Sequence, residues 1–160
     1  MGKLKLFFLY LVSFLLQCTV LNALNVFGTT PNILLMLTVI YSFFFKDFDG
    51  IVFSILFGLI QDAFFGQVIG ISALIYFAAG MLLKLIRSGV YRDNKLLLIL
   101  VTAATTLFYT VAYWALNSMM LQADMSILYW LKSVPVSIVW NYIVLLILLP
   151  IARKRRGFTI

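Results

Sequence analysis

Two apolar runs on either side of a short charged turn decide the fold of this chain. They occupy residues 31–65, whose sequence is PNILLMLTVIYSFFF, then KDFDG, then IVFSILFGLIQDAFF. The first run carries no charge and the second carries only Asp62. Such runs predict two apolar helices that form a hairpin within a membrane. At about 1.5 Å per residue, each run reaches about 22 Å, which is short for roughly 30 Å of bilayer hydrocarbon.

The composition extends this interpretation to the whole chain. Of its 160 residues, 64% are apolar and 11% are charged, whereas soluble domains average about 45–50% and about 25%. A soluble domain of this composition would lack a polar surface, so we predict an integral membrane protein. The chain has no histidine and a single cysteine, Cys18. These absences argue against an internal disulfide, a His or Cys metal site and imidazole-based catalysis, so we expect no enzyme activity, metal or cofactor.

Charges and helix breakers divide the chain into six apolar stretches. We therefore predict an all-α membrane protein, a compact bundle of six transmembrane helices forming one integral-membrane domain over residues 1–160. A basic cytoplasmic tail follows at residues 152–160. The predicted spans cover approximately residues 6–26, 31–45, 51–65, 70–83, 96–120 and 133–151.

The distribution of basic residues tests the number of spans. With six spans, eleven of the twelve Lys and Arg residues fall on one side of the membrane, and only Lys132 falls on the other. Loops rich in Lys and Arg remain cytoplasmic, so both termini are predicted to be cytoplasmic. The basic run Arg153–Arg156 is interpreted as a topology anchor, a contact for anionic lipid heads or a docking site for a cytoplasmic protein. Nucleic acid is not an expected partner, because no folded cytoplasmic module accompanies these charges.

Small residues recur every four positions in the third predicted span and beyond it. This spacing places them on one helix face, where small side chains allow helices to pack closely in a membrane. The face would pack either within the chain or against a partner helix. In the second case, a bulky residue at Gly58 should abolish the complex while the isolated chain still folds. The candidate packing or partner positions are Gly50, Ser54, Gly58, Asp62, Gly66 and Gly70.

Four further residues are candidate structural contacts between helices. Gln17 and Asn141 are polar positions within the first and sixth spans. Pro31 is predicted at the first helical position of the second span. The hairpin places Asn32 and Asp62 at the same external end, so we expect them to hydrogen-bond directly or through water. Asp62 is interpreted mainly as a structural cap, with a proton or substrate role and partner contact as alternatives.

The fifth predicted span carries a polar stripe at intervals of three or four residues. Such spacing places the side chains on one face of the helix. Because polar groups are costly in lipid, this face is predicted to point into the bundle. Its members are Thr102, Thr106, Tyr109, Tyr113 and Asn117.

These stretches resemble the rod shape-determining protein family MreD. The resemblance rests on Leu16-Gln17-Cys18-Thr19-Val20-Leu21, on Pro31-Asn32 at the start of an aliphatic span, and on Phe57-Gly58-Leu59-Ile60-Gln61-Asp62. Gly66 and the stretch Gly70-Ile71-Ser72-Ala73-Leu74 complete it. The length and the six-span pattern also match, so almost the whole chain is covered. Asn32 stands where Asp is common in the family, so the polar position is kept without its charge.

The resemblance implies a non-enzymatic scaffold in the bacterial cytoplasmic (inner) membrane that helps position peptidoglycan synthesis and maintain cell shape. Its implied direct partner is the bitopic protein MreC, within a complex that also holds MreB, RodA and a penicillin-binding transpeptidase. MreD-like proteins are also similar in fold to substrate-binding subunits of energy-coupling-factor transporters. A vitamin-binding subunit is therefore the alternative function, although the first predicted span has only Ala23 where such subunits are alanine-rich. Its pocket would involve Gln17, Asn117 and Asn141.

Overall fold

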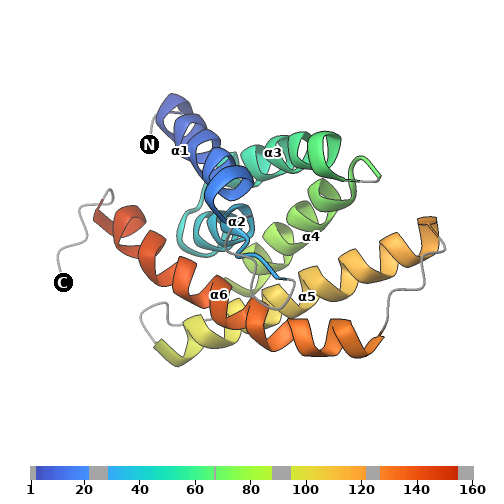
Figure 1. The fold of residues 1–160 in the computed structure, drawn as a ribbon. Helices are drawn as coiled ribbons and strands as arrows, with labels where there is room; N and C mark the ends of the chain where they lie inside the picture. Colours follow the sequence, from blue (N-terminus) through green and yellow to red (C-terminus); the bar gives the residue numbers. More distant parts are fainter. Residues whose placement is uncertain (1–2, 22–28, 67, 88–94, 122–126, 155–160) are drawn as a thin grey trace.

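The structure is a computed structural model that describes residues 3–21, 29–66, 68–87, 95–121 and 127–154. Within these ranges the chain forms six α-helices and no β-strand, which confirms the predicted all-helical class. One π-helical segment, η1, continues directly from the first helix (Figure 1). In chain order the helices are α1 (Lys3–Leu16), η1 (Gln17–Leu21), α2 (Ile33–Phe44), α3 (Asp49–Phe65), α4 (Ile71–Ile86), α5 (Lys95–Leu121) and α6 (Ile127–Lys154).

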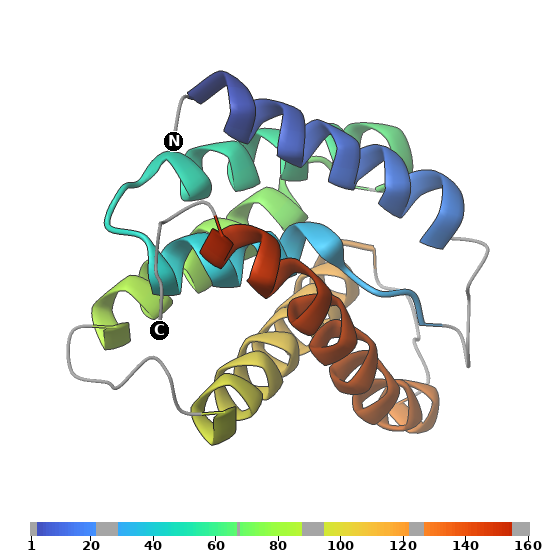
Figure 2. The ribbon, with the colours of Figure 1, turned by 90° about the vertical axis from the view of Figure 1, so that its left-hand side faces the viewer.

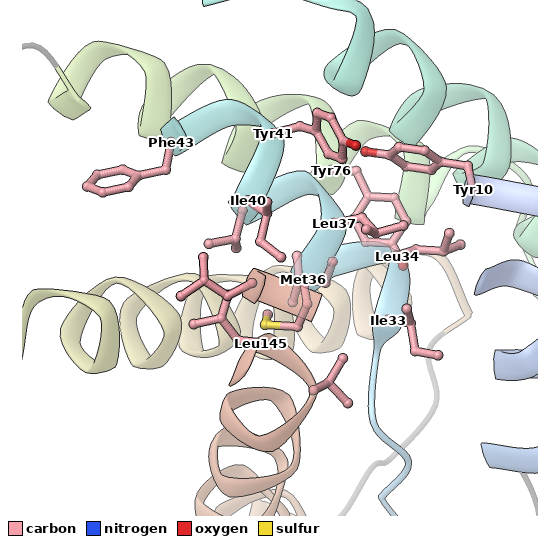
Figure 3. Packing of buried hydrophobic residues seen from close by; sticks show 14 of the residues in the cluster. Tyr10, Ile33, Leu34, Met36, Leu37, Ile40, Tyr41, Phe43, Tyr76 and Leu145 are labelled. Carbon is pink, nitrogen blue, oxygen red and sulfur yellow. The ribbon is translucent and has the colours of Figure 1, made fainter. Parts of the chain in front are cut away.

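Helix α2 is the centre of the fold. Every one of its 12 residues is buried, and it contacts each of the other five α-helices. A helix that is apolar on all sides is expected in an interior position. Figure 1 shows α2 between α1, α3, α4 and α6, and Figure 2 shows α5 and α6 meeting at an angle beside this core. Figure 3 shows side chains of α2 pointing in several directions, with Met36 near Leu145 of α6 and Tyr41 near Tyr10 of α1.

The observed helix bounds correct several predicted ones. Helix α2 begins at Ile33, so Pro31 precedes the N-cap residue Asn32 and is not the first helical residue. The Asn32 side chain accepts a hydrogen bond from Leu35 N at 2.9 Å, and this cap is what begins the helix. Helix α6 begins at Ile127, six residues before the predicted span, and runs through Pro135. The predicted end of the first span at 26 lies outside the described residues, as do residues 155–160 of the tail.

Helices of two lengths build the bundle. By length and composition, two segments of the described residues are suited to crossing a membrane, Leu96–Met119 and Leu131–Pro150. Two shorter apolar helices, Ile33–Phe44 and Ile71–Ile86, do not reach that length. At about 1.5 Å per residue, α2 extends only about 18 Å. The second and fourth predicted spans are therefore shorter than a full hydrocarbon layer, as the sequence indicated.

The outer surface of the bundle is apolar. Large aliphatic and aromatic side chains point outward from all the α-helices except α2, with Phe64 at 75%, Leu85 at 70% and Met119 at 80% exposure. Polar side chains lie inside, and Thr102, Thr106, Asn117 and Asn141 are all buried. The inward direction predicted for these polar residues is confirmed. Soluble monomers rarely expose apolar surface on this scale, whereas contact with lipid requires it.

The C-terminal end of α2 is held by two basic residues, Lys84 of α4 and Arg87, the C-cap residue of α4. Arg87 Nη1 donates to the carbonyl of Phe45, the C-cap residue of α2. Lys84 Nζ donates to the carbonyls of Lys46 and Asp47 and lies 4.1 Å from the centre of the Phe48 ring. A helix ends with unpaired carbonyl groups and a partial negative charge, which cationic side chains satisfy. These two basic residues therefore stabilise the end of the buried helix.

Candidate functional site

The small-residue face of α3 packs against other helices of the same chain. Gly50, Ser54 and Gly58 are buried. Ser54 Oγ lies 2.9 Å from Tyr10 Oη of α1 and 2.7 Å from Thr38 Oγ1 of α2. Tyr10 Oη also donates to the Gly50 carbonyl at 2.9 Å. This face therefore holds α1, α2 and α3 together through hydroxyl groups.

The two glycines of this face permit close approach of helices. A Cβ at Gly58 would lie 2.9 Å from Cα of Ala73 and 2.9 Å from Cδ2 of Tyr76, both in α4. A Cβ at Gly50 would overlap Cβ of Tyr41 in α2. Because backbone atoms of α4 occupy the space next to Gly58, a bulky residue there must displace a helix. This packing contradicts the expectation that such a variant of the isolated chain folds normally.

Asp62 joins the end of α3 to the start of α4. Its Oδ2 accepts from Gly70 N at 3.0 Å and from Ser72 N at 2.7 Å, and its side chain is 2% exposed. Gly70 has φ +100°, a left-handed conformation that favours glycine. Gly66 ends α3, and its N–H donates to the Asp62 carbonyl at 2.8 Å. A carboxylate on free amides at a helix N-terminus stabilises that terminus, so this geometry agrees with a structural role.

Asn32 and Asp62 make no direct hydrogen bond with each other among the described residues. Asn32 Oδ1 instead accepts from Leu35 N and lies 3.0 Å from Tyr76 Oη, while Asp62 holds the amides that begin α4. Tyr76 Oη also lies 3.0 Å from Gln61 Oε1. The α2–α3 hairpin does place the start of α2 and the end of α3 on the same side. The residue that approaches the start of α2 from α3, however, is Gln61, next to Asp62, and both Gln61 and Asn32 lie near Tyr76 Oη.

A polar pocket lies at the N-terminal end of α2. It has a volume of about 130 Å³ and is partly open. Its walls come from η1, the segment before α2, the C-terminal half of α3, and the middle parts of α5 and α6. The described residues that line it are all uncharged: Gln17, Thr30, Pro31, Asn32, Gln61, Tyr109, Thr110, Ser137 and Asn141.

All four of the predicted structural residues line this pocket, and Gln17, Asn32 and Asn141 also hydrogen-bond the start of α2. Gln17 Oε1 accepts from Leu34 N at 3.1 Å. Asn141 Oδ1 accepts from Asn32 N at 2.8 Å, and Asn141 Nδ2 donates to Thr106 Oγ1 at 3.1 Å. Because a helix begins with free N–H groups that lipid cannot satisfy, these side chains serve as partners for the start of α2. The sequence indicated that they are interhelical contacts but not that they meet.

The predicted and observed pocket residues differ in part. Asn117, a pocket candidate, instead donates to the Tyr113 carbonyl within α5 at 2.8 Å and does not line the pocket. Gln61, Thr110 and Ser137 line the pocket but were not predicted as pocket residues. The polar stripe of the fifth span was the available signal for Tyr109, whose ring stacks between those of Tyr76 and Tyr113 at centroid distances of 5.6 and 5.7 Å.

The described residues contain no group of three or more His, Cys, Asp or Glu side chains that could hold a metal ion. The site is instead a set of neutral amides and hydroxyl groups. Such groups can hydrogen-bond a neutral ligand or water, and they can hold helices together.

An apolar outer surface, buried neutral polar contacts and a short central helix define a membrane protein of the all-helical class. The family model for rod shape-determining protein MreD matches residues 2–155 of the 160. The chain therefore belongs to the MreD family, and its role lies in rod shape determination. No curated protein and no solved structure is significantly similar to it. The match gives no support to the vitamin-transporter alternative.

Proposed function

We propose that this protein is a non-enzymatic, polytopic membrane scaffold that binds MreC and helps to position peptidoglycan synthesis. The observation that carries the proposal is the family match over residues 2–155. In this proposal all six α-helices lie in the bacterial inner membrane, both termini are cytoplasmic, and residues 1–160 are one domain with a basic tail. MreB, RodA and a penicillin-binding transpeptidase belong to the same complex. The proposal also assigns the bundle a fold similar to that of a substrate-binding subunit of an energy-coupling-factor transporter, without that subunit's function.

The packing of the chain supports a particular kind of partner surface. The small-residue face of α3 is filled by α1, α2 and α4, so the MreC helix binds on an exposed apolar face of the bundle instead. Outward-facing residues such as Val52, Leu56 and Leu59 show that α3 has a second face, which is not covered by the chain. Gly50, Ser54 and Gly58 then act as packing positions that shape the bundle from within.

Native mass spectrometry of the protein extracted from its own membranes in mild detergent tests the partner. We expect the 18.2 kDa chain to remain bound to MreC. An unrelated polytopic protein from the same membranes is the control for carry-over. Recovery of the chain without MreC, under conditions that keep other membrane complexes intact, would contradict the scaffold proposal.

Cysteine labelling tests the proposed topology. The native Cys18 is replaced by serine, and single variants Lys46→Cys, Lys84→Cys and Lys132→Cys are exposed to a membrane-impermeant maleimide in intact spheroplasts. Only Lys132→Cys should react, and all three should react after lysis. Reaction of Lys46→Cys from outside would place the α2–α3 turn on the wrong side for cytoplasmic termini.

A further inference from the structure

The outer surface that α3 and α4 form together is apolar over nearly its whole length, and we call it the α3–α4 face. The two helices pack side by side in the bundle. Large apolar side chains point outward from both of them, including Val52, Leu56 and Leu59 of α3 and Leu74, Phe77 and Leu82 of α4. The charged side chains of the two helices are Asp49 in the first turn of α3, Lys84 in the last turn of α4, and Asp62, which is buried.

The two exposed charges limit the height of this face at one end. Asp49 pairs with Lys3 at 3.7 Å at the beginning of α3. Lys84 Nζ donates to the carbonyls of Lys46 and Asp47 in the turn before α3, so the charges of both helices lie at one level. Between this level and the opposite helix ends, at about 1.5 Å per residue, the apolar length is about 24 Å along α3 and about 20 Å along α4.

Helices α5 and α6 form a longer side of the bundle. Their apolar segments, Leu96–Met119 and Leu131–Pro150, reach about 36 Å and about 30 Å. Figures 1 and 2 show them on the side of α2 opposite to α1 and α3. A helix that is too long for its bilayer can tilt, and α5 and α6 meet at an angle, so they cannot both stand upright. A helix that is too short cannot gain height by tilting.

The residue types on the α3–α4 face favour lipid as its neighbour. Helices in a membrane pair closely through small residues. The small residues Gly50, Ser54 and Gly58 of α3 face inward, and the exposed residues of the two helices are large apart from Ala63. One partner helix, about 10 Å across, covers only part of a surface that is two helices wide. Lipid chains therefore contact this face both in the isolated chain and in a complex.

We propose that the α3–α4 face thins the bilayer around it and selects phospholipids with short acyl chains. The inference rests on the proposed placement of all six α-helices in the membrane. A hydrocarbon layer of about 30 Å would cover the polar ends of α3 and α4, which is costly. The lipid at this face compresses to about 20–24 Å, whereas the layer beside α5 and α6 keeps its thickness. The bundle thus has a thin side and a thick side.

Fluorescence quenching by brominated lipid measures the local choice of lipid. In a Cys18→Ser background, Leu56→Cys of α3 is compared with Leu107→Cys of α5, because these side chains are 42% and 46% exposed. Each purified full-length variant carries a bimane label in mixtures of dimyristoleoyl and dierucoyl phosphatidylcholine, with one or the other lipid brominated. The label at Leu56→Cys should favour the short-chain lipid about threefold, and the label at Leu107→Cys should show no preference for it.

A second pair of positions keeps the test decisive if one variant does not fold. Phe77→Cys of α4 and Val139→Cys of α6 repeat the comparison with other exposed side chains. Equal preference on the two sides, or a preference for the long-chain lipid at α3 and α4, overturns the inference while the quenching itself retains the membrane placement. Labels at Leu56→Cys and Phe77→Cys that no brominated lipid quenches overturn the placement and the inference together. Binding of MreC is scored separately by co-purification, and it can fail without changing the lipid preference.

Discussion

Replacing Gly58 by isoleucine tests whether the small-residue face of α3 is an internal contact. The Cβ of any side chain there would lie 2.9 Å from Cα of Ala73, whereas carbon atoms in contact lie about 3.5–4.0 Å apart. Helix α4 must therefore move by at least about 0.6 Å for the first carbon alone. Overpacking of this kind costs about 1–3 kcal/mol. Because backbone atoms cannot rotate away, we expect about 3 kcal/mol, less a few tenths from the better helix propensity of isoleucine.

The assay is thermal unfolding of the purified chain in nanodiscs without any partner. A loss of about 3 kcal/mol should lower the midpoint by about 6–12 °C in a chain of this size. Ala63→Ile is the matched control, because Ala63 lies on the exposed side of the same helix. It should change the midpoint by less than about 2 °C. A Gly58→Ile variant that unfolds like the wild type but no longer binds MreC would refute internal packing and restore the partner groove.

Three further substitutions test the buried polar contacts, each by the shift in unfolding midpoint. Asp62→Ala should lower the free energy of unfolding by about 1–2 kcal/mol, because two amides that begin α4 lose their acceptor. Asp62→Asn should lower it by less, and equal losses in the two variants would contradict a capping role. Tyr10→Phe should cost about 1 kcal/mol, because its hydroxyl has two buried partners; no change would show that those bonds contribute nothing. Arg87→Ala should cost about 1–3 kcal/mol, because the Phe45 carbonyl loses a donor. Lys84→Ala, at a more exposed position, should cost less than about 1 kcal/mol; the reverse order would refute the assigned roles.

Sequence periodicity predicted the contacts that depend on one helix at a time. Intervals of four placed Gly50, Ser54 and Gly58 on one face, and the structure buries that face. The stripe of the fifth span was located by the same argument, and its members Thr102 and Thr106 are fully buried. In both cases the direction of a side chain follows from its position on a single helix.

Contacts that depend on how helices cross could not be predicted in the same way. Asn32 N and Asn141 Oδ1 are 109 positions apart in the chain. Their meeting requires a particular depth of α2 and a particular crossing of α6 against it. Counting residues outward from the turn placed Asn32 level with Asp62, but Asp62 is used to begin α4. The amide next to it, Gln61, faces the pocket instead, because adjacent residues on a helix point about 100° apart.

The short central helix gives the scattered polar residues a common physical reason. A helix of 12 residues surrounded by protein has free N–H groups at one end and free carbonyl groups at the other, and both sets need hydrogen-bond partners. Here Gln17, Asn32 and Asn141 meet the first end, and Lys84 and Arg87 meet the segment that follows the other. These partners come from η1, α6 and α4, and from the cap itself. The depth of α2 and the positions of its neighbours are thus mutually dependent. A change in any one of these side chains should therefore alter the packing of the bundle beyond its own contact.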